Sequence, residues 1–566
     1  MKKNIKFKIL FTLLLSSFII SCDSYLETDP DNRLIEEQVI SDPSLAEGWL
    51  LKAYKGLPTN YNFNIDVATD DANTNNFGLN INNMNNGGWN SNSNPVSTWN
   101  QSYEMLLYLN KFLQNVDAIP WFPNDATKDA DFRKRITAEA KGLRAWYNFR
   151  LLQAHAGEGE NGKMLGFPIV DKVLTDEDNF ELPRNTFKKC VDFILQDCND
   201  AIQGLPVRYT GNDPVVGERN LNRINGLAVE LIKSRVALYA ASPSYQTAKA
   251  SNWTEAANFA ANVITNNGGL TLNGNDVTFY LAGNAAQQPQ DILWSSTILP
   301  NVSGWENSNL PPSLFGQGRT NPTQNFVDAF SMSDGTPINQ SATYDPNNPY
   351  VDRDPRLEKF VIYNLSTFSG AFIKSSQTSL PDLEIDAINS VSNFKTTTGY
   401  YLKKFMNPAV SLDPSGQTVG APHFYTYARM TEAYLNFAEA ANEAGGPDNN
   451  IQGYTPRDVI NAIRTRAGIS STAFVDAITS TADMRKVIQN ERRIELSFEG
   501  HRFWDLRRWG LTSTISESVE GINISENNST YSKFVVAPRN YQSFQIYGPI
   551  PLSEIQKYNL IQNKGW

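Results

Sequence analysis

Residues 490–510 read NERRIELSFEGHRFWDLRRWG, and their parts are best explained together. Read as a helix from about Ala482, the sequence places five apolar residues on one stripe at the 3.6-residue period: Met484, Val487, Ile488, Ile494 and Phe498. Glu491 and Glu495 fall in the middle of that stripe. A carboxylate on a buried face is costly unless it is paired and hydrogen-bonded. The segment therefore predicts two buried carboxylates with cationic partners.

The same segment offers candidate partners for these carboxylates. It carries five arginines, and those after Gly500 alternate with aromatic residues: Arg502, Phe503, Trp504, Arg507, Arg508 and Trp509. Guanidinium groups pair with buried carboxylates and stack on aromatic faces. Two carboxylates at i and i+4 could instead be a catalytic pair or metal ligands, but so many arginines would keep both ionised. We interpret four residues as a charged structural brace: Glu491, Glu495, Arg502 and Arg507.

The N-terminus has the pattern of an exported lipoprotein. Residues 1–21 begin with four lysines and continue with the apolar run Ile9 to Ile20, which is too short to span a bilayer comfortably. The following Phe-Ile-Ile-Ser-Cys (18–22) looks like a lipobox that is loose at its first positions. We therefore predict a signal peptide over 1–21 and a lipid on Cys22, which would anchor the protein without a spanning helix.

Composition excludes several classes of function. Without the lysines of the signal, 45 Lys and Arg face 59 Asp and Glu, a net charge of −14 that argues against nucleic acid as a partner. His155, His423 and His501 stand far apart, so no metal-ligand spacing occurs. Cys190 and Cys198 lie too far apart on one predicted helix to bond each other, and are expected to be buried thiols. No nucleophile motif or phosphate loop is present, and we predict no catalytic residue, metal or cofactor.

Most of the chain outside one central region reads as helical hairpins. Apolar residues recur at helical spacing in 44–54, 96–119, 133–155, 186–203, 225–241, 252–264, 427–444 and 456–467. Ala138, Gly142 and Ala145 are small sites where a second helix can approach closely. Thr455, Pro456 and Gly468 are typical of helix ends. We predict a mostly α fold, a tetratricopeptide-like, right-handed scaffold of degenerate helical hairpins.

Residues 265–425 differ from the rest, being rich in Asn, Gly, Pro, Ser and Thr with short β-like runs such as 291–297 and 360–363. A segment of this length is too long to be one structureless loop in a compact domain. We predict a large, irregular, loop-rich lobe that contains short strands.

Candidate ligand-binding residues come from aromatic rings set among small polar residues. Residues 73–94 contain 11 asparagines together with Phe77 and Trp89, and Trp305 lies in Asn-Val-Ser-Gly-Trp-Glu-Asn-Ser-Asn (301–309). Amides bond to sugar hydroxyls, and exposed rings stack on sugar faces. We therefore predict Trp89, Phe77 and Trp305 as a sugar-binding surface. The alternative readings are a flexible polar loop for 73–94 and core burial for Trp305.

Several motifs in order resemble the SusD-like (RagB/SusD) family. They are IELSFEGHRFWDLRRWG (494–510), NPTQNFVDAF (321–330), DRDPRL (352–357), TGYYLKKF (398–405), EAYLNFAEA (432–440), IRTRAG (463–468), PIPLSE (549–554) and QNKGW (562–566). Each motif is weak alone, but their order is specific. The resemblance extends from Cys22 to Trp566, and the only departure noted is Lys564, where the family usually has proline.

The resemblance implies a non-catalytic, lipid-anchored protein of the outer-membrane surface. Such a protein binds a glycan and delivers it to a SusC-like TonB-dependent transporter, which SusD-like proteins close like a lid. It implies an N-terminal SusD-like region over 22–264 and a C-terminal region over 265–566, whose irregular lobe (265–425) precedes closing helices and a tail. The family's ligand residues lie in variable loops, so the three aromatic candidates rest on the local argument alone.

Two other functions remain open at this stage. A glycoside hydrolase on a helical scaffold could use carboxylates such as Asp70 and Asp71, although adjacent residues point different ways on a strand. A peptide-capturing lipoprotein of the same family would share the scaffold, and the sequence alone does not separate it from a glycan binder.

Overall fold

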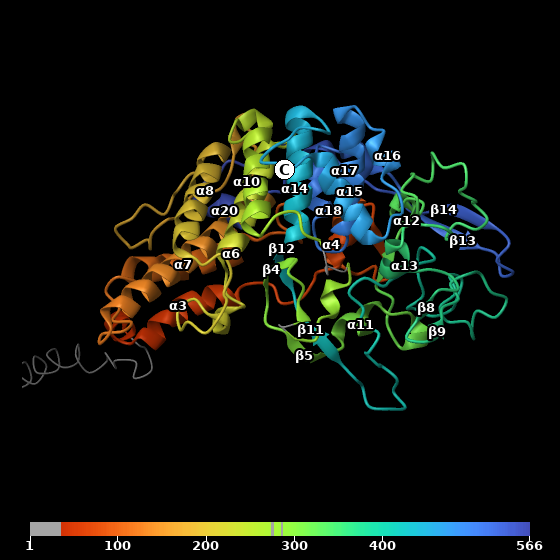
Figure 1. Cartoon of the computed structure of the whole chain (residues 1–566), viewed down its shortest axis with the longest axis horizontal. Coiled ribbons are helices and arrows are strands. Elements are labelled where there is room, and N and C mark those ends of the chain that lie inside the picture. Colours follow the sequence, from red (N-terminus) through yellow and green to blue (C-terminus); the bar gives the residue numbers. More distant parts are fainter. Residues whose placement is uncertain (1–34, 273–276, 285–286) are drawn as a thin grey trace, which may run out of the picture.

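Helices packed side by side make up most of the protein in the computed structural model, which describes residues 35–272, 277–284 and 287–566. Its long helices are α3 (Pro43–Lys55), α6 (Trp99–Asn115), α7 (Ala126–His155), α8 (Phe187–Gly204), α9 (Gly226–Ala241), α10 (Trp253–Asn266), α14 (Met430–Gly445), α15 (Pro456–Ala467) and α17 (Thr481–Glu495). Neighbours in this array pack in chain order, from α6 on α7 through α8, α9 and α10 to α14, which also contacts α15 and α17. Figure 1 shows α8, α10, α14 and α17 along one side. The predicted mostly helical fold is confirmed.

Side-chain caps mark the starts of four helices, and the cap predicted at Thr455 is confirmed. The side-chain oxygens of four residues accept the backbone N–H three positions later: Thr186 before α8, Asn225 before α9, Asn252 before α10 and Thr455 before α15. Pro456 occupies the first position of α15, and Gly468 follows its end with a φ of 96°. These bonds satisfy N–H groups that a helix start leaves unpaired.

Small residues let α7 approach its neighbours closely. A Cβ on Gly142 would lie 3.0 Å from a methyl carbon of Val229 in α9, and a Cβ on Gly204 in α8 would lie 2.6 Å from Cβ of Ala138. A methyl group added at Gly204 would therefore push α8 away from α7, whereas one at Gly142 would require the Val229 side chain to shift. The predicted role of Ala138 and Gly142 as contact sites is confirmed.

Short strands occur mainly in the loop-rich part, and all pair antiparallel, two by two. The pairs are β1 (Ala72–Thr74) with β6 (Thr320–Pro322), β2 (Gly157–Glu158) with β3 (Met164–Leu165), β4 (Ile292–Ser295) with β12 (Thr426–Arg429), β5 (Leu299–Val302) with β11 (Ala421–His423), β7 (Val361–Ile362) with β10 (Tyr401–Leu402), β8 (Thr367–Phe368) with β9 (Ala371–Phe372), and β13 (Val519–Ile524) with β14 (Tyr531–Ala537).

The remaining α-helices of the described chain are short. They are α2 (Glu36–Ser41), α4 (Asn64–Val67), α5 (Asn83–Asn86), α11 (Gly304–Asn309), α12 (Gln324–Ala329), α13 (Arg356–Phe360), α16 (Ala473–Asp476), α18 (Arg502–Arg508), α19 (Thr512–Ser516) and α20 (Leu552–Tyr558). Figure 1 places α11, α13, β8 and β9 in a looser region beside the helical array.

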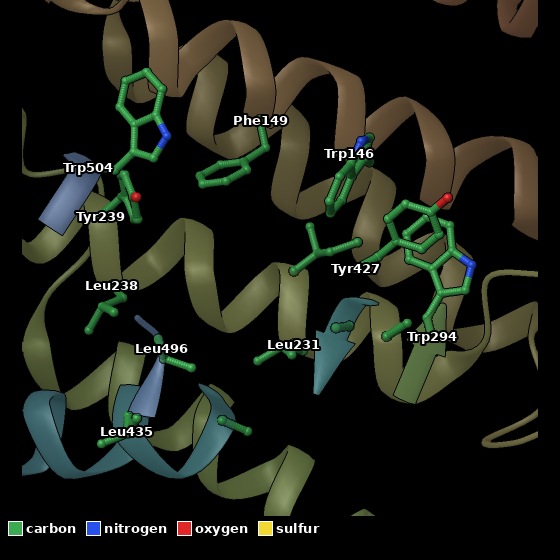
Figure 2. Packing of buried hydrophobic residues seen from close by; sticks show 14 of the residues in the cluster. Trp146, Phe149, Leu231, Leu238, Tyr239, Trp294, Tyr427, Leu435, Leu496 and Trp504 are labelled. Atoms are coloured by element: carbon green, nitrogen blue, oxygen red, sulfur yellow. The ribbon is translucent and has the colours of Figure 1, made fainter. Parts of the chain in front are cut away.

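Aromatic rings fill the core between the array and the first strand pairs of the lobe. Trp146 of α7 meets Trp294 of β4 edge to face at 5.5 Å between ring centres, and Trp294 lies 4.3 Å from Tyr427 of β12. On the same helix, Phe149 meets Tyr239 of α9 at 5.2 Å. Figure 2 shows these rings gathered along the flank of α7. The lobe is thus held to the scaffold by a continuous apolar core.

Several predicted helices have different ends: the helix predicted over 133–155 begins at Ala126, and the one predicted over 96–119 spans Trp99–Asn115. The helix predicted to run through Phe498 ends at Glu495, and Phe498 has a φ of 58°, which no helix accommodates. Residues 427–429 belong to strand β12, because their backbone pairs with β4 before α14 begins. At residues 427–429 a tertiary contact therefore overrides the local periodicity.

The predicted signal peptide over 1–21 and the lipid site at Cys22 lie outside the described residues. In the part that is described, no helix combines the length and the apolar character needed to cross a bilayer. The domain boundaries at 22–264 and 265–566 stay a prediction.

Candidate functional site

A buried ion network joins α17 to the loop-rich lobe. Arg356 of α13 donates to Glu491 and, at 2.8 Å, to Glu495, and it pairs with both carboxylate oxygens of Asp354. None of these four side chains is more than 2% exposed. The predicted burial of Glu491 and Glu495 is confirmed, but their partner was not foreseen, because it lies 135 residues before Glu491 in the sequence.

Three arginines hold Glu495 in its ionised form. Burial alone would raise the pKa of this carboxyl group, but Arg466, Arg356 and Arg429 lower it from 4.5 to about 2. The Lys404 ammonium also donates to the backbone carbonyl of Glu495 at 2.9 Å. A carboxylate that stays ionised has no proton to give at neutral pH. Glu495 is therefore suited to a structural role and unsuited to that of a general acid.

Arg502 of the brace and the neighbouring Arg493 hold the chain where it enters β1. Arg502 of α18 forms a bidentate pair with Asp70 at 2.9 and 2.8 Å, and Arg493 of α17 lies 2.6 Å from Asp71. Burial would raise the pKa of Asp70, but Arg493 and Arg502 lower it. Asp70 is 7% exposed and Asp71 is fully buried. Arg502 thus belongs to the predicted brace, with Asp70 as its partner in place of a glutamate of α17.

Arg507 and Trp89 lie together in the core. The predicted stacking of Arg507 on aromatic rings is confirmed, but its pairing with a carboxylate and the exposure of Trp89 need correction. In the described chain Arg507 pairs with no carboxylate; its guanidinium donates to the carbonyl of Phe503 at 3.0 Å and lies 3.5 Å from that ring centre. Trp89 is only 4% exposed, since Arg507 covers it at 5.5 Å and Trp566 meets it at 4.7 Å. Its indole N–H donates to Asn94 at 3.1 Å. The prediction of an exposed Trp89 ring is therefore wrong.

One amide organises the loops next to the brace. β1 pairs with β6, which brings the asparagine-rich stretch against the lobe. Just beyond β1, the Asn75 side chain donates to the carbonyls of Gln317, Gly318 and Lys395 at 3.0, 3.0 and 3.2 Å, and it accepts from Arg319 at 3.2 Å. These five residues are called the Asn75 cluster. The stretch is thus an ordered part of the fold, which excludes the reading of a flexible loop at this point.

A groove of about 680 Å³ runs beside the Asn75 cluster, and we call it the Phe77 groove. Phe77 lies at its edge and is 79% exposed, as predicted for an accessible ring. Ten of its other lining residues carry an amide or a hydroxyl group: Asn73, Asn82, Asn85, Asn86, Gln377, Asn389, Asn523, Thr74, Thr396 and Thr397. An apolar part of the wall comes from Ile388, Phe534, Val536, Ala537 and Pro538. Lys395 and Arg539 also line it, and no Asp or Glu is among its lining residues. The groove is therefore rich in hydrogen-bonding groups and poor in negative charge.

A smaller depression of about 320 Å³, the Trp305 hollow, also borders this asparagine-rich stretch. Asn76, Asn309, Arg319 and Trp305 are among its lining residues. Trp305 itself is 6% exposed, and its N–H donates to Asn60 at 3.2 Å. The expectation of an exposed Trp305 ring is wrong, because neighbouring rings from the lobe and the 61–63 loop pack around it. Trp305 therefore lines the hollow, but its ring is too deeply buried to stack on a ligand.

The exposed rings near the Asn75 cluster are phenylalanines, and the sequence argument missed two of them. Phe315 is 50% and Phe394 is 37% exposed, and each lies within two residues of a carbonyl that Asn75 holds. The guanidinium of Arg319 lies 5.1 Å from the Phe394 ring centre. Phe394 stands between Asn393 and Lys395, so the rule used for Trp89 could have found it. No described tryptophan is exposed.

The described residues offer little to metal or thiol chemistry. No group of three or more His, Cys, Asp or Glu side chains among them could hold a metal ion. Cys190 and Cys198 are buried free thiols, and burial raises the pKa of Cys190 to about 12. A thiol with so high a pKa is a poor nucleophile at neutral pH.

Comparison with known proteins places the chain in a family. A family model described as "SusD family" matches residues 290–566, and one described as "Starch-binding associating with outer membrane" matches residues 24–216. The chain belongs to the SusD-like family. The first match contains the brace, Phe315 and Phe394, and the second contains Asn75 and Phe77. The Asn75 cluster is thus built from both matched regions, and the resemblance read from the motifs is confirmed.

Relatives of this SusD-like chain are similar along almost its whole length. SusD-like protein P25 of Formosa agariphila is 21% identical, and the match covers 96% of this chain and 95% of that protein. A crystal structure of a SusD-like protein from Bacteroides fragilis has a TM-score of 0.73 at 22% identity, covering 94% of this chain and 99% of the other. A SusD-like carbohydrate binding protein from the same species has a TM-score of 0.71 at 21% identity, covering 92% and 99%. At this identity the structures show a shared fold.

Proposed function

We propose that this SusD-like chain binds glycans at the Asn75 cluster, in the Phe77 groove and the Trp305 hollow, without cleaving them. The observation that carries the proposal is the 79% exposed Phe77 ring at the edge of an amide-lined groove. Amides both donate to and accept from hydroxyl groups, and an exposed ring covers the apolar face of a sugar. The brace supports this use, since it fixes the chain directly before β1.

The lining of both depressions favours binding over hydrolysis. Glycoside hydrolases need two carboxyl groups that flank the bond to be cleaved. Neither the Phe77 groove nor the Trp305 hollow has an Asp or Glu among its lining residues. Asp70 and Asp71, the carboxylates considered for a hydrolase, are buried in ion pairs with Arg493 and Arg502. Their position supports a structural role.

We further propose that the bound glycan passes to a SusC-like TonB-dependent transporter while a lipid on Cys22 holds the protein at the outer-membrane surface. Membership of the SusD-like family supports this step, as does the description of the matching model, which refers to association with the outer membrane. Co-purification of the tagged chain with a barrel transporter from outer-membrane extracts tests it, and replacement of Cys22 by alanine should release the protein into the soluble fraction.

The binding site is tested by removing one ring. Phe77→Ala should weaken binding to the best polysaccharide of a glycan panel by roughly 1–3 kcal/mol, the range found for bases stacked on aromatic rings. Phe372→Ala is the matched control, because Phe372 is 72% exposed and lies in β9, outside the groove. Calorimetry on both variants measures the difference.

Two outcomes would count against this proposal. If Phe77→Ala and the unaltered protein bind the glycan with equal affinity, the Phe77 groove is not the binding site. Tight binding of peptides, with no glycan of the panel bound, would favour the peptide-capturing alternative.

A further inference from the structure

A further pocket opens behind the 58–62 loop. It has a volume of about 160 Å³ and lies between α7, β12 and the start of α18. Pro58, Asn60 and Asn62 are exposed at its mouth, whereas Trp146 and Trp504 are buried in its wall. A water molecule needs about 10–15 Å³ of such space, so the pocket has room for one small ligand ring. Its neighbour across the loop is the Trp305 hollow, because Tyr61 and Asn62 line both.

The charges in this pocket do not balance. Three arginines and two glutamates line it: Arg150, Arg235, Arg429, Glu432 and Glu499. Arg235 forms a bidentate pair with Glu432 at 2.6 Å for both bonds, and Arg429 forms another with Glu499 at 2.8 Å for both.

Arg150, near the end of α7, has no carboxylate partner within the described chain. Its guanidinium donates only to the side-chain oxygen of Gln153, at 3.3 Å. Burial lowers the pKa of the neighbouring His501 to about 4, so His501 adds no charge at neutral pH. One half-buried positive charge therefore lines the pocket without a carboxylate partner, and an anionic ligand could pair with it.

Other groups in the pocket are suited to a sugar ring. The hydroxyl oxygen of Thr426 is buried without a hydrogen-bond partner in the described structure. Gln153, Asn60 and Asn62 add amides to the lining, and the Tyr425 and Trp504 rings add flat apolar walls. Hydroxyl groups of a ligand could pair with the first set while its ring lies against the second.

We propose that this pocket binds the carboxylate-bearing ring of an acidic sugar, a uronate, with Arg150 as the ion-pair partner of the carboxylate. A planar guanidinium forms paired hydrogen bonds with a carboxylate, which matches this charge and geometry. The inference rests on the proposed function, since a glycan in the Trp305 hollow would reach the pocket across Asn62. It narrows the substrate class to glycans that contain uronic acids.

The test is a titration of the purified protein with sodium glucuronate, glucose and N-acetylglycine, the last a mimic of a peptide terminus. Arg150→Gln should weaken glucuronate binding at least tenfold, whereas Arg150→Lys, which keeps the charge, should lose less. Arg219→Gln is the matched control, because Arg219 is an exposed arginine outside every described ion pair. Thermal unfolding of each variant checks that it folds.

Glucuronate binding by the unaltered protein that exceeds binding of glucose and N-acetylglycine supports the proposal, together with the tenfold loss. Equal binding of glucose, equal binding of N-acetylglycine, absence of glucuronate binding, or unchanged affinity in Arg150→Gln would each overturn it. If Arg150→Gln does not fold, the ligand comparison and Arg150→Lys decide. Loss of polysaccharide binding in Phe77→Ala reports on the proposed function, whereas loss of glucuronate binding in Arg150→Gln reports on this pocket, so the two proposals can fail separately.

Discussion

Asn75 connects three segments of the candidate site through one side chain. Its amide donates to carbonyls on both the 317–318 turn and the 394–397 segment, and it sits directly after β1. An asparagine side chain has two N–H donors and one acceptor oxygen, so nearly all of its capacity is used here. The exposed Phe77 and Phe394 rings extend from the segments that this amide fixes.

Replacement of Asn75 by alanine should destabilise the protein by about 1–3 kcal/mol, because buried carbonyl groups lose their donors. It should also weaken glycan binding, since the segments that carry Phe77 and Phe394 are no longer held together. Urea unfolding and calorimetry measure the two effects. Asn92→Ala is the control within the same asparagine-rich stretch. Its side chain is exposed and forms none of the described hydrogen bonds, so a change within about 0.5 kcal/mol is expected. Equal effects of the two substitutions would contradict the role of Asn75.

The local sequence predicted the exposure of Phe77 correctly and the exposure of Trp89 wrongly, and one physical reason explains both outcomes. Both stand among small polar residues, so local sequence offers neither a place in the core. Trp89 is nevertheless buried by Arg507 and Trp566, which follow it by more than 400 positions. Burial that depends on such distant residues leaves no trace in the local pattern.

At the scale of the elements, α17 and α18 connect the helical array to the lobe and to the segment directly before β1. α17 supplies Glu491 and Glu495 to Arg356 of the lobe, and α18 supplies Arg502 to Asp70 before β1. A buried ion pair does not by itself make a fold more stable than apolar residues would. Its directional bonds do fix how elements from distant parts of the chain meet.

Arg356→Met should destabilise the protein by about 3–5 kcal/mol, because it leaves Asp354, Glu491 and Glu495 buried without their shared cation. The control is Arg485→Met, which also breaks an arginine–glutamate pair involving α17. Arg485 is 44% exposed in its pair with Glu443, and exposed pairs contribute about 0–1 kcal/mol. Denaturant unfolding of the two variants gives the comparison. Similar losses for both would show that the Arg356 network contributes no more than a surface pair.

The helices were largely predictable from the sequence, whereas the residues that form ion pairs with them were not. Capping residues such as Thr186 and Thr455 mark helix starts locally, and the structure has helices there. The brace was predicted from two carboxylates on an apolar stripe, which is also a local signal. Arg356 and Asp70 could not be named as partners, because ion pairing across the fold depends on tertiary contacts rather than on spacing along the chain.

At the scale of the whole molecule, the candidate site lies where the two parts of the fold meet. β1 follows the first helices of the chain, and its partner β6 belongs to the loop-rich lobe. The helical array (Figure 1) therefore acts as a rigid support for loops that only the lobe completes. In a site of this kind, substitutions in the loops can change which ligand is bound, while the helical scaffold stays the same.

The protein should lose stability as the pH falls from about 6.5 to about 2. Burial lowers the pKa of His155 and His501 from 6.5 to about 4, so the unfolded chain binds protons first below pH 6.5. Burial opposes ionisation of Glu432 and Glu495, but neighbouring arginines lower both pKa values from 4.5 to about 2. Their stabilisation is complete above pH 4.5 and disappears as the pH falls toward 2. Urea unfolding at a series of pH values measures the trend, and constant stability between pH 6.5 and 4 would contradict it.

The central claim is that a glycan binds at the Asn75 cluster and the Phe77 groove. Hydrogen–deuterium exchange with and without a bound oligosaccharide tests this claim most directly. The account predicts that the ligand slows exchange in residues 73–86, 304–320 and 377–397 and leaves α8 and α10 unchanged. Slower exchange confined to the helical array, with no change in those three segments, would contradict it.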